Sequence, residues 1–371
     1  MKANRIKILV MILFILLGIT VAHAQQQEKT FNLGKNGKIE VKIDYGDIKI
    51  DPWGKDQVNV IYEKDEDSGA LSFQMVQNGN TLTISSGDYP NEDLVIDVPN
   101  SINLDLNTEG GDIVISGNLS GKIECSTSGG DIETKDITGK ADLNTAGGEI
   151  TTGKIDGDIN VNSGGGDLNI GTITGEADLN TGGGNVQVYN VNKKLKVRTG
   201  GGNVKAGDVG GELTVTTGGG NVTVEKVTGT AKVTTGGGDV SVAGAAGKSE
   251  ITTGGGNVSL KNMSGGVECY TGSGDVYVEL NPDPGLDTKI KAGTGNITLY
   301  LPATAKATIV AKVRGWDSWE ENKTDPITSD FANTTEDKGE HRMKSTYVLN
   351  GGGSKIELET TSGEIHIKKQ K

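Results

Sequence analysis

A glycine-marked repeat with a period of 18 positions constrains the fold of this chain more than any other feature. Along the sequence, a run of glycines repeatedly ends in Asp, Asn or Glu. These polar residues are Asp112, Asp131, Glu149, Asp167, Asn185, Asn203, Asn221, Asp239, Asn257, Asp275 and Asn296. The first step is 19, each of the next eight is 18 and the last is 21. A period held this long is typical of a solenoid, in which each repeat forms one turn of the chain.

Alternating apolar residues predict two short strands in each repeat. In the unit that begins at Asn221, Val222 and Val224 share one side of a first strand. Ala231 and Val233 share one side of a second. Residues that recur every 18 positions form the first inward column, which holds Ile132, Ile150, Leu168, Val186, Val204, Val222, Val240, Val258 and Val276. The second holds Leu143, Val161, Leu179, Val197, Val215, Val233 and Ile251.

A single repeat cannot fold alone. Burying about five small aliphatic side chains contributes roughly 7–15 kcal/mol, whereas ordering the backbone of one repeat costs on the order of 18–36 kcal/mol. Neighbouring rungs must therefore supply hydrogen bonds and cover the remaining apolar surface. We predict an all-β, single-stranded parallel β-solenoid (β-helix) of 18-residue rungs stacked about 4.8 Å apart. A right-handed coil is expected, because parallel crossovers prefer that hand.

The two cysteines fit this register without forming a disulfide. Cys125 and Cys269 are 144 residues apart, which equals eight repeats of 18. Both fall in the second inward column, and eight rungs separate them by about 38 Å. A disulfide needs Cα atoms within about 7 Å of each other. We therefore expect two buried free thiols.

The chain divides into four parts by the strictness of the repeat. Residues 25–108 carry similar strands without the period, which indicates irregular opening rungs, with a separate sandwich domain as the alternative. Residues 109–300 are the regular repeats. Residues 301–371 are expected to add closing rungs and a polar loop at 315–344 that holds Trp316 and Trp319. Charged residues on the strands between 355 and 368 suit an exposed sheet edge.

Residues 1–24 have the features of a secretory signal peptide. Lys2, Arg5 and Lys7 precede an apolar run, and Ala22-His23-Ala24 fits a cleavage site before Gln25. The alternative, a membrane anchor, would need about 20 apolar residues, and the run is shorter. No segment of the mature chain is apolar enough to span a membrane. Export to the periplasm, the cell surface or the extracellular medium is therefore expected.

The charge of the mature chain excludes one class of partner. The formal net charge is −13, and removing the three positive charges of the signal segment leaves −16. Phosphate backbones and anionic lipid surfaces repel such a chain. Nucleic acid is therefore not an expected partner.

The sequence resembles the bacterial β-strand-repeat family of unknown function that carries the label "putative adhesin". The matching features are Gly-Asp-Ile-Lys-Ile-Asp-Pro-Trp at 46–53, Val-Pro at 98–99, the repeated Gly-Gly-Asp-Ile rungs, and the closing 351–353 and 361–367 segments. The resemblance covers almost the whole mature chain. It implies a solenoid fold, and it implies no catalytic residue.

The residue pattern does not indicate a catalytic site. A calcium-binding site is the more specific alternative to a purely structural solenoid. His341 and His366 are the histidines of the mature chain, and no Ser/His/Asp or Cys/His arrangement is visible. Toxin-type calcium rolls have turns of the same length, although their glycine motif differs from this one. Asp112, Asp131, Glu149 and Asp167 would stack as four carboxylates, which a cation could bridge. The plainer interpretation is solvated corner residues, where Asn tolerates the left-handed conformation.

A column of Thr and Ser also follows the repeat. Its members are Thr127, Thr145, Ser163, Thr181, Thr199, Thr217, Thr235, Thr253 and Thr271. Exposed Thr rows occur in ice-binding solenoids. This column, however, has the parity of the second inward column. We therefore expect it to face inward near a corner and to bond to the backbone.

Three functional hypotheses follow. The first is an exported, non-enzymatic cell-envelope or surface protein, an adhesin or binding scaffold for an envelope, matrix or host-surface ligand. The second is a periplasmic structural or envelope-stress component. The third is a calcium-stabilised solenoid. No cofactor other than calcium is expected.

Overall fold

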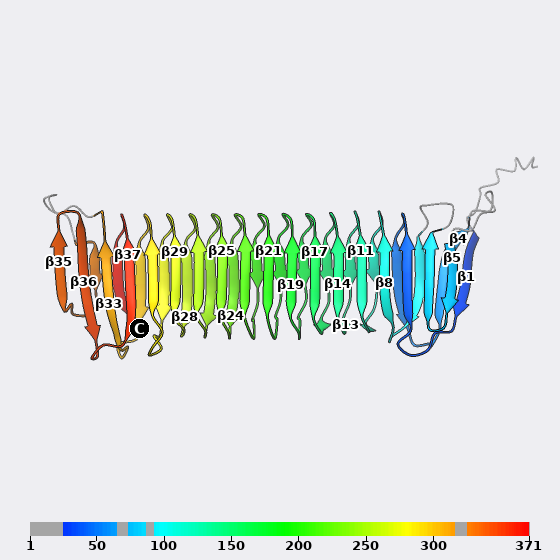
Figure 1. Ribbon diagram of the computed structural model, residues 1–371, viewed down its shortest axis with the longest axis horizontal. Coiled ribbons are helices and arrows are strands. Elements are labelled where there is room, and N and C mark those ends of the chain that lie inside the picture. The colour runs from blue at the N-terminus through cyan, green and yellow to red at the C-terminus, as the bar shows by residue number, and fades with distance from the viewer. Residues whose placement is uncertain (1–24, 65–72, 87–92, 316–324, 371) are drawn as a thin grey trace, which may run out of the picture.

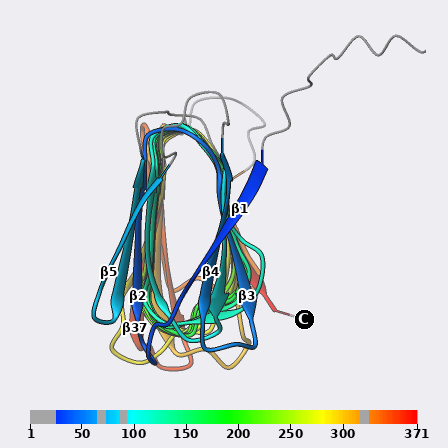
Figure 2. The same cartoon turned by 90° about the vertical axis from the view of Figure 1, so that its right-hand side faces the viewer.

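The computed structural model describes residues 25–64, 73–86, 93–315 and 325–370. The predicted signal peptide, Trp316 and Trp319 lie outside these residues. The described residues form strands and turns and no helix. The strands stack side by side into a long rod, with each strand perpendicular to the long axis (Figure 1). Viewed along the axis, two sheets face each other across a narrow core (Figure 2). The prediction of an all-β parallel solenoid is confirmed, and right-handed winding stays a prediction.

One long sheet, sheet B, carries the second strand of each repeat. From the N-terminal end of the rod its order is β5 (Phe73–Asn78), β6 (Thr81–Ser86), β2 (Lys38–Ile43), β8 (Asn103–Thr108), β11 (Ile123–Thr127), β14 (Ala141–Thr145), β17 (Ile159–Ser163), β19 (Ala177–Thr181), β21 (Leu195–Thr199), β23 (Leu213–Thr217), β25 (Ala231–Thr235), β27 (Ser249–Thr253), β29 (Val267–Thr271), β31 (Thr288–Ala292), β37 (Ser354–Thr360), β33 (Ala307–Val313), β36 (Arg342–Leu349) and β35 (Thr335–Gly339).

The opposite sheet, sheet A, carries the first strand of each repeat. Its order is β1 (Gln25–Phe31), β4 (Val58–Lys64), β7 (Leu94–Pro99), β3 (Ile48–Trp53), β9 (Ile113–Ile115), β12 (Ile132–Thr134), β15 (Ile150–Thr152), β18 (Leu168–Ile170), β20 (Val186–Val188), β22 (Val204–Ala206), β24 (Val222–Val227), β26 (Val240–Ala245), β28 (Val258–Met263), β30 (Val276–Leu280), β32 (Ile297–Leu301), β38 (Ile365–Lys369) and β34 (Ile327–Ser329).

A third, narrow ladder closes the turn below sheet A. It consists of β10 (Leu119–Ser120), β13 (Ile137–Thr138) and β16 (Ile155–Asp156). Single bridges continue it from Ile155 through Ile173, Val191 and Val209 to Val227. The residues in this ladder are again one repeat apart.

The register explains why like residues recur every 18 positions. Val204 pairs with Val222 in sheet A, and Val197 pairs with Val215 in sheet B. Each inward side chain therefore packs between two similar side chains on the neighbouring rungs. The residues of both inward columns are buried, and they belong to one hydrophobic core that runs the length of the rod. Both inward columns were predicted from the sequence, and their burial confirms them.

At the N-terminal end the rungs are stacked out of chain order. Strand β2 lies between β6 and β8, and β3 lies between β7 and β9. All of these pairings are parallel, so strands β2, β3, β6, β7 and β8 continue the stack of the regular repeats. Antiparallel strands β1 and β4 end sheet A, and the antiparallel pair of β5 and β6 ends sheet B.

At the C-terminal end the rungs are also stacked out of chain order, which corrects the expected sheet edge and the expected polar loop. Strands β37 and β38 pair on both sides, β37 with β31 and β33, and β38 with β32 and β34. The charged strands between 355 and 368 are therefore interior strands of their sheets and not the expected edge. Their charged side chains point outward and alternate with buried Ile and Leu. The expected polar loop at 315–344 contains β34, β35 and the start of β36, and its residues 316–324 lie outside the described part.

Candidate binding groove

The proposed calcium ligands stack in one column, as expected, and most of them hold a backbone group. Asp112, Asp131, Glu149 and Asp167 directly precede β9, β12, β15 and β18. The Asp131 backbone N–H donates to Asp112 Oδ1 at 2.8 Å, and the Glu149 N–H donates to Asp131 Oδ1 at 2.7 Å. We call this column the corner ladder. It runs onward through Asp and Asn residues to Asn296, whose Oδ1 accepts the Glu364 N–H.

The corner ladder explains why Asp and Asn alternate freely in this column. Both side chains place one acceptor oxygen at the same distance from the backbone, within reach of the next rung. Glu is longer, and Glu149 Oε1 instead accepts from Thr151 Oγ1 at 3.1 Å. Tolerance of the left-handed conformation is the wrong reason, because the described non-glycine residues with positive φ are Asn36, Asn262 and Asn350. None of these belongs to the ladder.

The ladder gives the acidic residues a structural role that needs no cation. Among the described residues, no group of three or more His, Cys, Asp or Glu side chains is arranged to hold a metal ion. One oxygen of Asp131 is already engaged with the next rung. Stabilisation by calcium therefore stays a hypothesis, and substitution of Asp131 tests it.

We expect Asp131→Asn to leave stability within about 0.5 kcal/mol, because the amide oxygen can accept the same hydrogen bond. Asp131→Ala removes that acceptor and should cost about 1 kcal/mol. Urea unfolding of both variants and the unchanged chain, each in calcium and in excess chelator, measures this. The calcium hypothesis predicts the opposite pattern, in which Asn is as damaging as Ala and calcium raises the midpoint of the unchanged chain alone.

The Thr column faces inward, as predicted, and braces the glycine corners. Its residues are buried. Thr235 Oγ1 donates to the Gly220 carbonyl at 2.9 Å and accepts the Gly238 N–H at 3.2 Å. Ser163 makes the same two bonds, to Gly148 and Gly166. An exposed ice-binding row is therefore not what this column forms.

Both cysteines are free and buried, as predicted. Burial raises the pKa of both thiols, that of Cys269 to about 12. Their thiolates are therefore scarce at neutral pH, and the thiol is the unreactive form.

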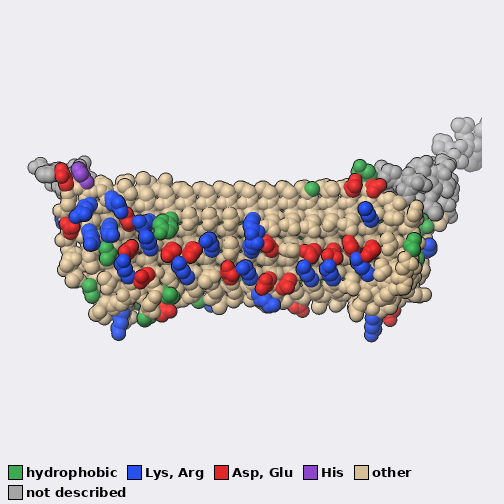
Figure 3. Space-filling model, in the orientation of Figure 1, with side chains coloured by type: hydrophobic (Ala, Val, Ile, Leu, Met, Phe, Trp, Pro, Cys, Tyr) green, Lys and Arg blue, Asp and Glu red, His purple; other side chains and the backbone are tan. Residues whose placement is uncertain are grey.

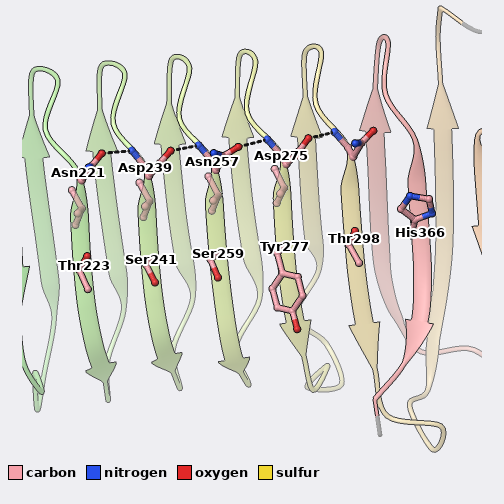
Figure 4. Close-up of a pocket in the computed structure, with 15 residues that line it drawn as sticks. Asn221, Thr223, Asp239, Ser241, Asn257, Ser259, Asp275, Tyr277, Thr298 and His366 are labelled. Atoms are coloured by element: carbon pink, nitrogen blue, oxygen red, sulfur yellow. Dashed lines mark hydrogen bonds between the residues drawn. The ribbon is translucent and has the colours of Figure 1, made fainter.

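A groove of about 670 Å³ runs along the outer face of sheet A in its C-terminal half (Figure 4). Two outward columns line it. The corner ladder supplies Asn221, Asp239, Asn257, Asp275 and Asn296, and the next outward column supplies Thr223, Ser241, Ser259, Tyr277, Thr298 and His366. The groove is hollow because three successive rungs carry a small hydroxyl residue in the second column.

Aromatic and charged side chains continue the groove toward the lower edge of sheet A. Tyr277 and Tyr300 lie on β30 and β32, with ring centroids 5.1 Å apart. The Lys368 ammonium lies 5.9 Å from the Tyr300 ring centroid. A second hollow of about 720 Å³ is lined by these residues together with Glu279 and Asp330, among others. Since Tyr277 lines both hollows, they form one continuous surface, which we call the sheet A groove.

Hydrogen bonds fix the polar groups at this end. The Tyr277 hydroxyl donates to the Glu279 carboxylate, and this bond, aided by burial, raises the pKa of Tyr277 to about 12. The hydroxyl therefore stays protonated at neutral pH and the ring keeps its position. His366 Nδ1 lies 2.7 Å from Thr328 Oγ1, and its Nε2 lies 3.3 Å from a Glu364 oxygen.

The outer face of sheet B differs in character. Rows of acidic and basic side chains cross it, and the glycine corners above them are bare of charge (Figure 3). Lys196 and Arg198 both reach Asp178, and Lys248 reaches Glu250 and Glu268. Exposed pairs of this kind contribute little to stability. This face carries charges of both signs, whereas the hydroxyl-lined part of the sheet A groove does not.

Sequence reasoning missed the groove, although a signal for it exists. In the second outward column of sheet A, Lys205 gives way to Thr223, Ser241 and Ser259. The meeting of Tyr277 and Tyr300 has no such signal, because the irregular last step of the repeat separates their rungs. The two histidines are not brought together: His366 lies on β38 and His341 in the turn between β35 and β36.

A comparison of the sequence with known protein families identifies the family to which this chain belongs. The sequence matches Toastrack DUF4097 over residues 36–210 and again over residues 191–368. The chain belongs to the Toastrack DUF4097 family. The two matches overlap in the middle of the regular repeats. They span most of the described rod.

Several solved structures are similar along their whole length at low identity. A "putative cell adhesion protein" from Clostridium sporogenes is 14% identical, with 93% of this chain and 100% of that chain covered and a TM-score of 0.16. A "putative adhesin" from Parabacteroides distasonis is 12% identical, with 94% and 98% covered and a TM-score of 0.24. A "putative lipid binding protein" from the same organism is 12% identical, with 93% and 97% covered and a TM-score of 0.20. Scores this low carry no argument of their own.

No curated protein matches the sequence. Within the described part of the chain, no helix has the length and apolarity needed to cross a membrane.

Proposed function

We propose that the mature chain is an exported, non-enzymatic scaffold of the cell surface that binds a ligand along its side, as an adhesin does. The observation that carries this proposal is the continuous rod with an open groove on one long face. One hydrophobic core holds every rung in place, so the outer side chains form a fixed array. A rigid rod presents many weak contacts at once with little cost of ordering its backbone on binding.

The strands at the ends of the rod disfavour end-to-end pairing with other protein chains. Antiparallel strands end both sheets at the N-terminal side, and β35 and β36 end sheet B at the other. Strand β35 carries Glu336, Asp337 and Lys338, and charges on an edge strand oppose pairing with another chain. The long faces are thereby favoured over the ends as the interaction surface.

The groove chemistry favours binding over catalysis. A hydrolytic site needs a nucleophile or water held by a base inside a site that excludes solvent. The sheet A groove is open along its length. Among its described lining residues, Thr223, Ser241 and Ser259 have no histidine beside them, and His366 lies at the far end beside Thr298. The low number of aromatic residues elsewhere makes Tyr277 and Tyr300 the natural contact points of this face.

Protease treatment of intact cells that express the full-length chain tests the surface location. We expect loss of the signal from an antibody raised against the folded chain, while a periplasmic control protein is spared. Permeabilised cells provide the reference, because they show that the protease can cleave the folded rod. Protection in intact cells with cleavage after permeabilisation would overturn the surface location and leave the periplasmic structural or envelope-stress role.

A further inference from the structure

We propose that the sheet A groove binds an extended neutral glycan that lies along the rod axis, across the rungs. This inference deepens the proposed binding function and does not depend on whether the protein lies at the surface or in the periplasm. The groove spans the rungs from β24 to β38, which is five steps of about 4.8 Å. It therefore accommodates a chain of several sugar units in an extended form.

The polar groups of the groove repeat with the rungs. The ladder position of each rung offers an amide or a carboxylate, and the neighbouring column offers a hydroxyl on three successive rungs. Asp239 and Asp275 each use one oxygen to accept a backbone N–H, from Asn257 and Asn296, so the second oxygen can accept from a ligand. A polymer whose hydroxyl groups also recur at regular spacing satisfies such an array. A glycan has that chemistry.

Tyr277 and Tyr300, which we call the aromatic shoulder, supply the apolar part of the contact. Tyr277 is half-buried at the end of the hydroxyl row, and its ring leans on Tyr300 at an interplanar angle of 42°. The bond from its hydroxyl to Glu279 holds the ring in place before any ligand arrives. Sugar rings carry apolar C–H faces that pack on aromatic rings, while their hydroxyls remain available to the polar rows. A fixed aromatic group loses little entropy on binding.

Charge separates a neutral glycan from other polymers. Asp239 and Asp275 lie in the hydroxyl-lined part of the groove and Glu279 lies beyond Tyr277, so phosphate and carboxylate groups would be repelled in that part, while Lys368 and Lys369 line the second hollow. Nucleic acids, phospholipid headgroups and acidic polysaccharides are therefore poor occupants. An extended peptide would seek unpaired backbone groups at a sheet edge. The strands under the groove are paired on both sides.

The hollow is a local feature of the rod, which supplies matched controls. In the same outward column, Glu133, Gln187 and Lys205 carry long side chains on other rungs. Thr151 occupies this column outside the groove, several rungs toward the N-terminus. Tyr189 directly follows β20, two rungs before β24 and outside the groove lining, and 62% of its surface is exposed. Substitutions at these two positions change the surface equally and spare the groove.

Affinity electrophoresis of the folded mature chain tests the proposal. The gels contain mixed-linkage glucan, xylan, galactomannan or dextran, and an acidic polysaccharide serves as the contrast. We expect at least one neutral polysaccharide to retard the chain. Ser241→Arg should block the groove and Tyr277→Ala should remove its shoulder, each weakening binding by at least about tenfold, which is 1.4 kcal/mol. Thr151→Arg and Tyr189→Ala should bind as the unchanged chain does.

The outcomes separate this inference from the proposed function. Retardation by no neutral polysaccharide would overturn the glycan assignment and leave a surface scaffold with another ligand. Retardation that survives both Ser241→Arg and Tyr277→Ala would overturn the groove as its site. Unfolding curves of all four variants accompany the gels, because a groove variant counts only if it unfolds at the same urea concentration as its control. Tyr277→Phe keeps the ring but removes its hydrogen bond to Glu279, so it should weaken binding less than Tyr277→Ala does, which provides a second, milder groove variant.

Discussion

Gly238→Ala should lower the free energy of unfolding by at least about 3 kcal/mol, whereas Gly237→Ala should change it by no more than about 0.5 kcal/mol. The two glycines are neighbours in the corner between β25 and β26. A Cβ at Gly238 would lie 2.0 Å from the Gly220 oxygen and 2.8 Å from the Asn221 nitrogen. A Cβ at Gly237 would meet nothing within 4 Å.

The clash at Gly238 cannot be relieved by a side-chain movement. The atoms it meets belong to the backbone of the preceding rung, which is held from several directions. The Thr235 hydroxyl donates to the Gly220 oxygen, and the Asn221 side chain accepts the Asp239 N–H. Relief therefore requires two rungs to move apart, which weakens the parallel hydrogen bonds between them.

The chain itself supports the contrast. In later rungs the middle position of the glycine corner is occupied by Ser273 and Thr294, while the glycines on both sides are retained. Urea unfolding followed by circular dichroism measures both variants against the unchanged chain. Equal midpoints for Gly237→Ala and Gly238→Ala would show that the rungs are further apart at the corner than the structure has them.

This corner also shows how much of the fold the sequence contains. The constant period of the repeat determines which residues become neighbours on adjacent rungs, so both inward columns, the buried Thr column and the unpaired cysteines followed from spacing alone. The prediction works because a solenoid converts distance along the chain into position on a rung. Each regular rung then tests the same prediction again.

The ends of the rod could not be predicted in this way because the period is absent there. Strand β37 pairs with β31, although β32 to β36 lie between them in the sequence, and β33 lies on its other side. Nothing in the spacing of residues 301–371 shows that β37, which comes late in the sequence, is inserted between β31 and β33. The charges on β37 and β38 therefore suggest an edge in the sequence, whereas in the structure they lie on the outer side of an interior rung.

The candidate binding groove could not be predicted from the sequence for a different reason. A groove depends on side chains that are small relative to those on neighbouring rungs, and this contrast is visible only when the outward column is read as a surface. The corner ladder is likewise visible in the sequence as a column, but the sequence does not show which backbone groups its side chains bond. Its actual basis, an acceptor oxygen that reaches the next rung's N–H, requires the distance between rungs and the direction of the Asp131 side chain.

Thr253→Val should cost about 3 kcal/mol, because it removes a hydroxyl that serves two buried backbone groups. Thr253 Oγ1 donates to the Gly238 carbonyl at 2.9 Å and accepts the Gly256 N–H at 3.1 Å. Valine has nearly the same shape, so packing is preserved while both partners are left without that bond. An unsatisfied buried donor or acceptor costs about 1–3 kcal/mol each.

Two further substitutions isolate the hydroxyl as the cause. Thr253→Ser keeps both bonds and loses one methyl group, so it should cost about 1 kcal/mol. Ser163 shows that serine fits this column and makes the equivalent bonds. Thr252→Val changes the exposed neighbour on β27 and should stay within about 0.5 kcal/mol. If Thr253→Ser proved as damaging as Thr253→Val, the methyl group rather than the hydroxyl would hold the corner.

The combination with the glycine corner makes the test stricter. Gly238 is the residue whose carbonyl accepts from Thr253 and whose N–H donates to Thr235, so the two predictions meet at one residue. In the double variant Gly238→Ala with Thr253→Val, displacement of the corner has already broken the threonine bond. The cost of the pair should therefore be smaller than the sum of the single costs, as expected for residues that share a partner. Additive costs would mean that Gly238 and Thr253 act on different features of the rung.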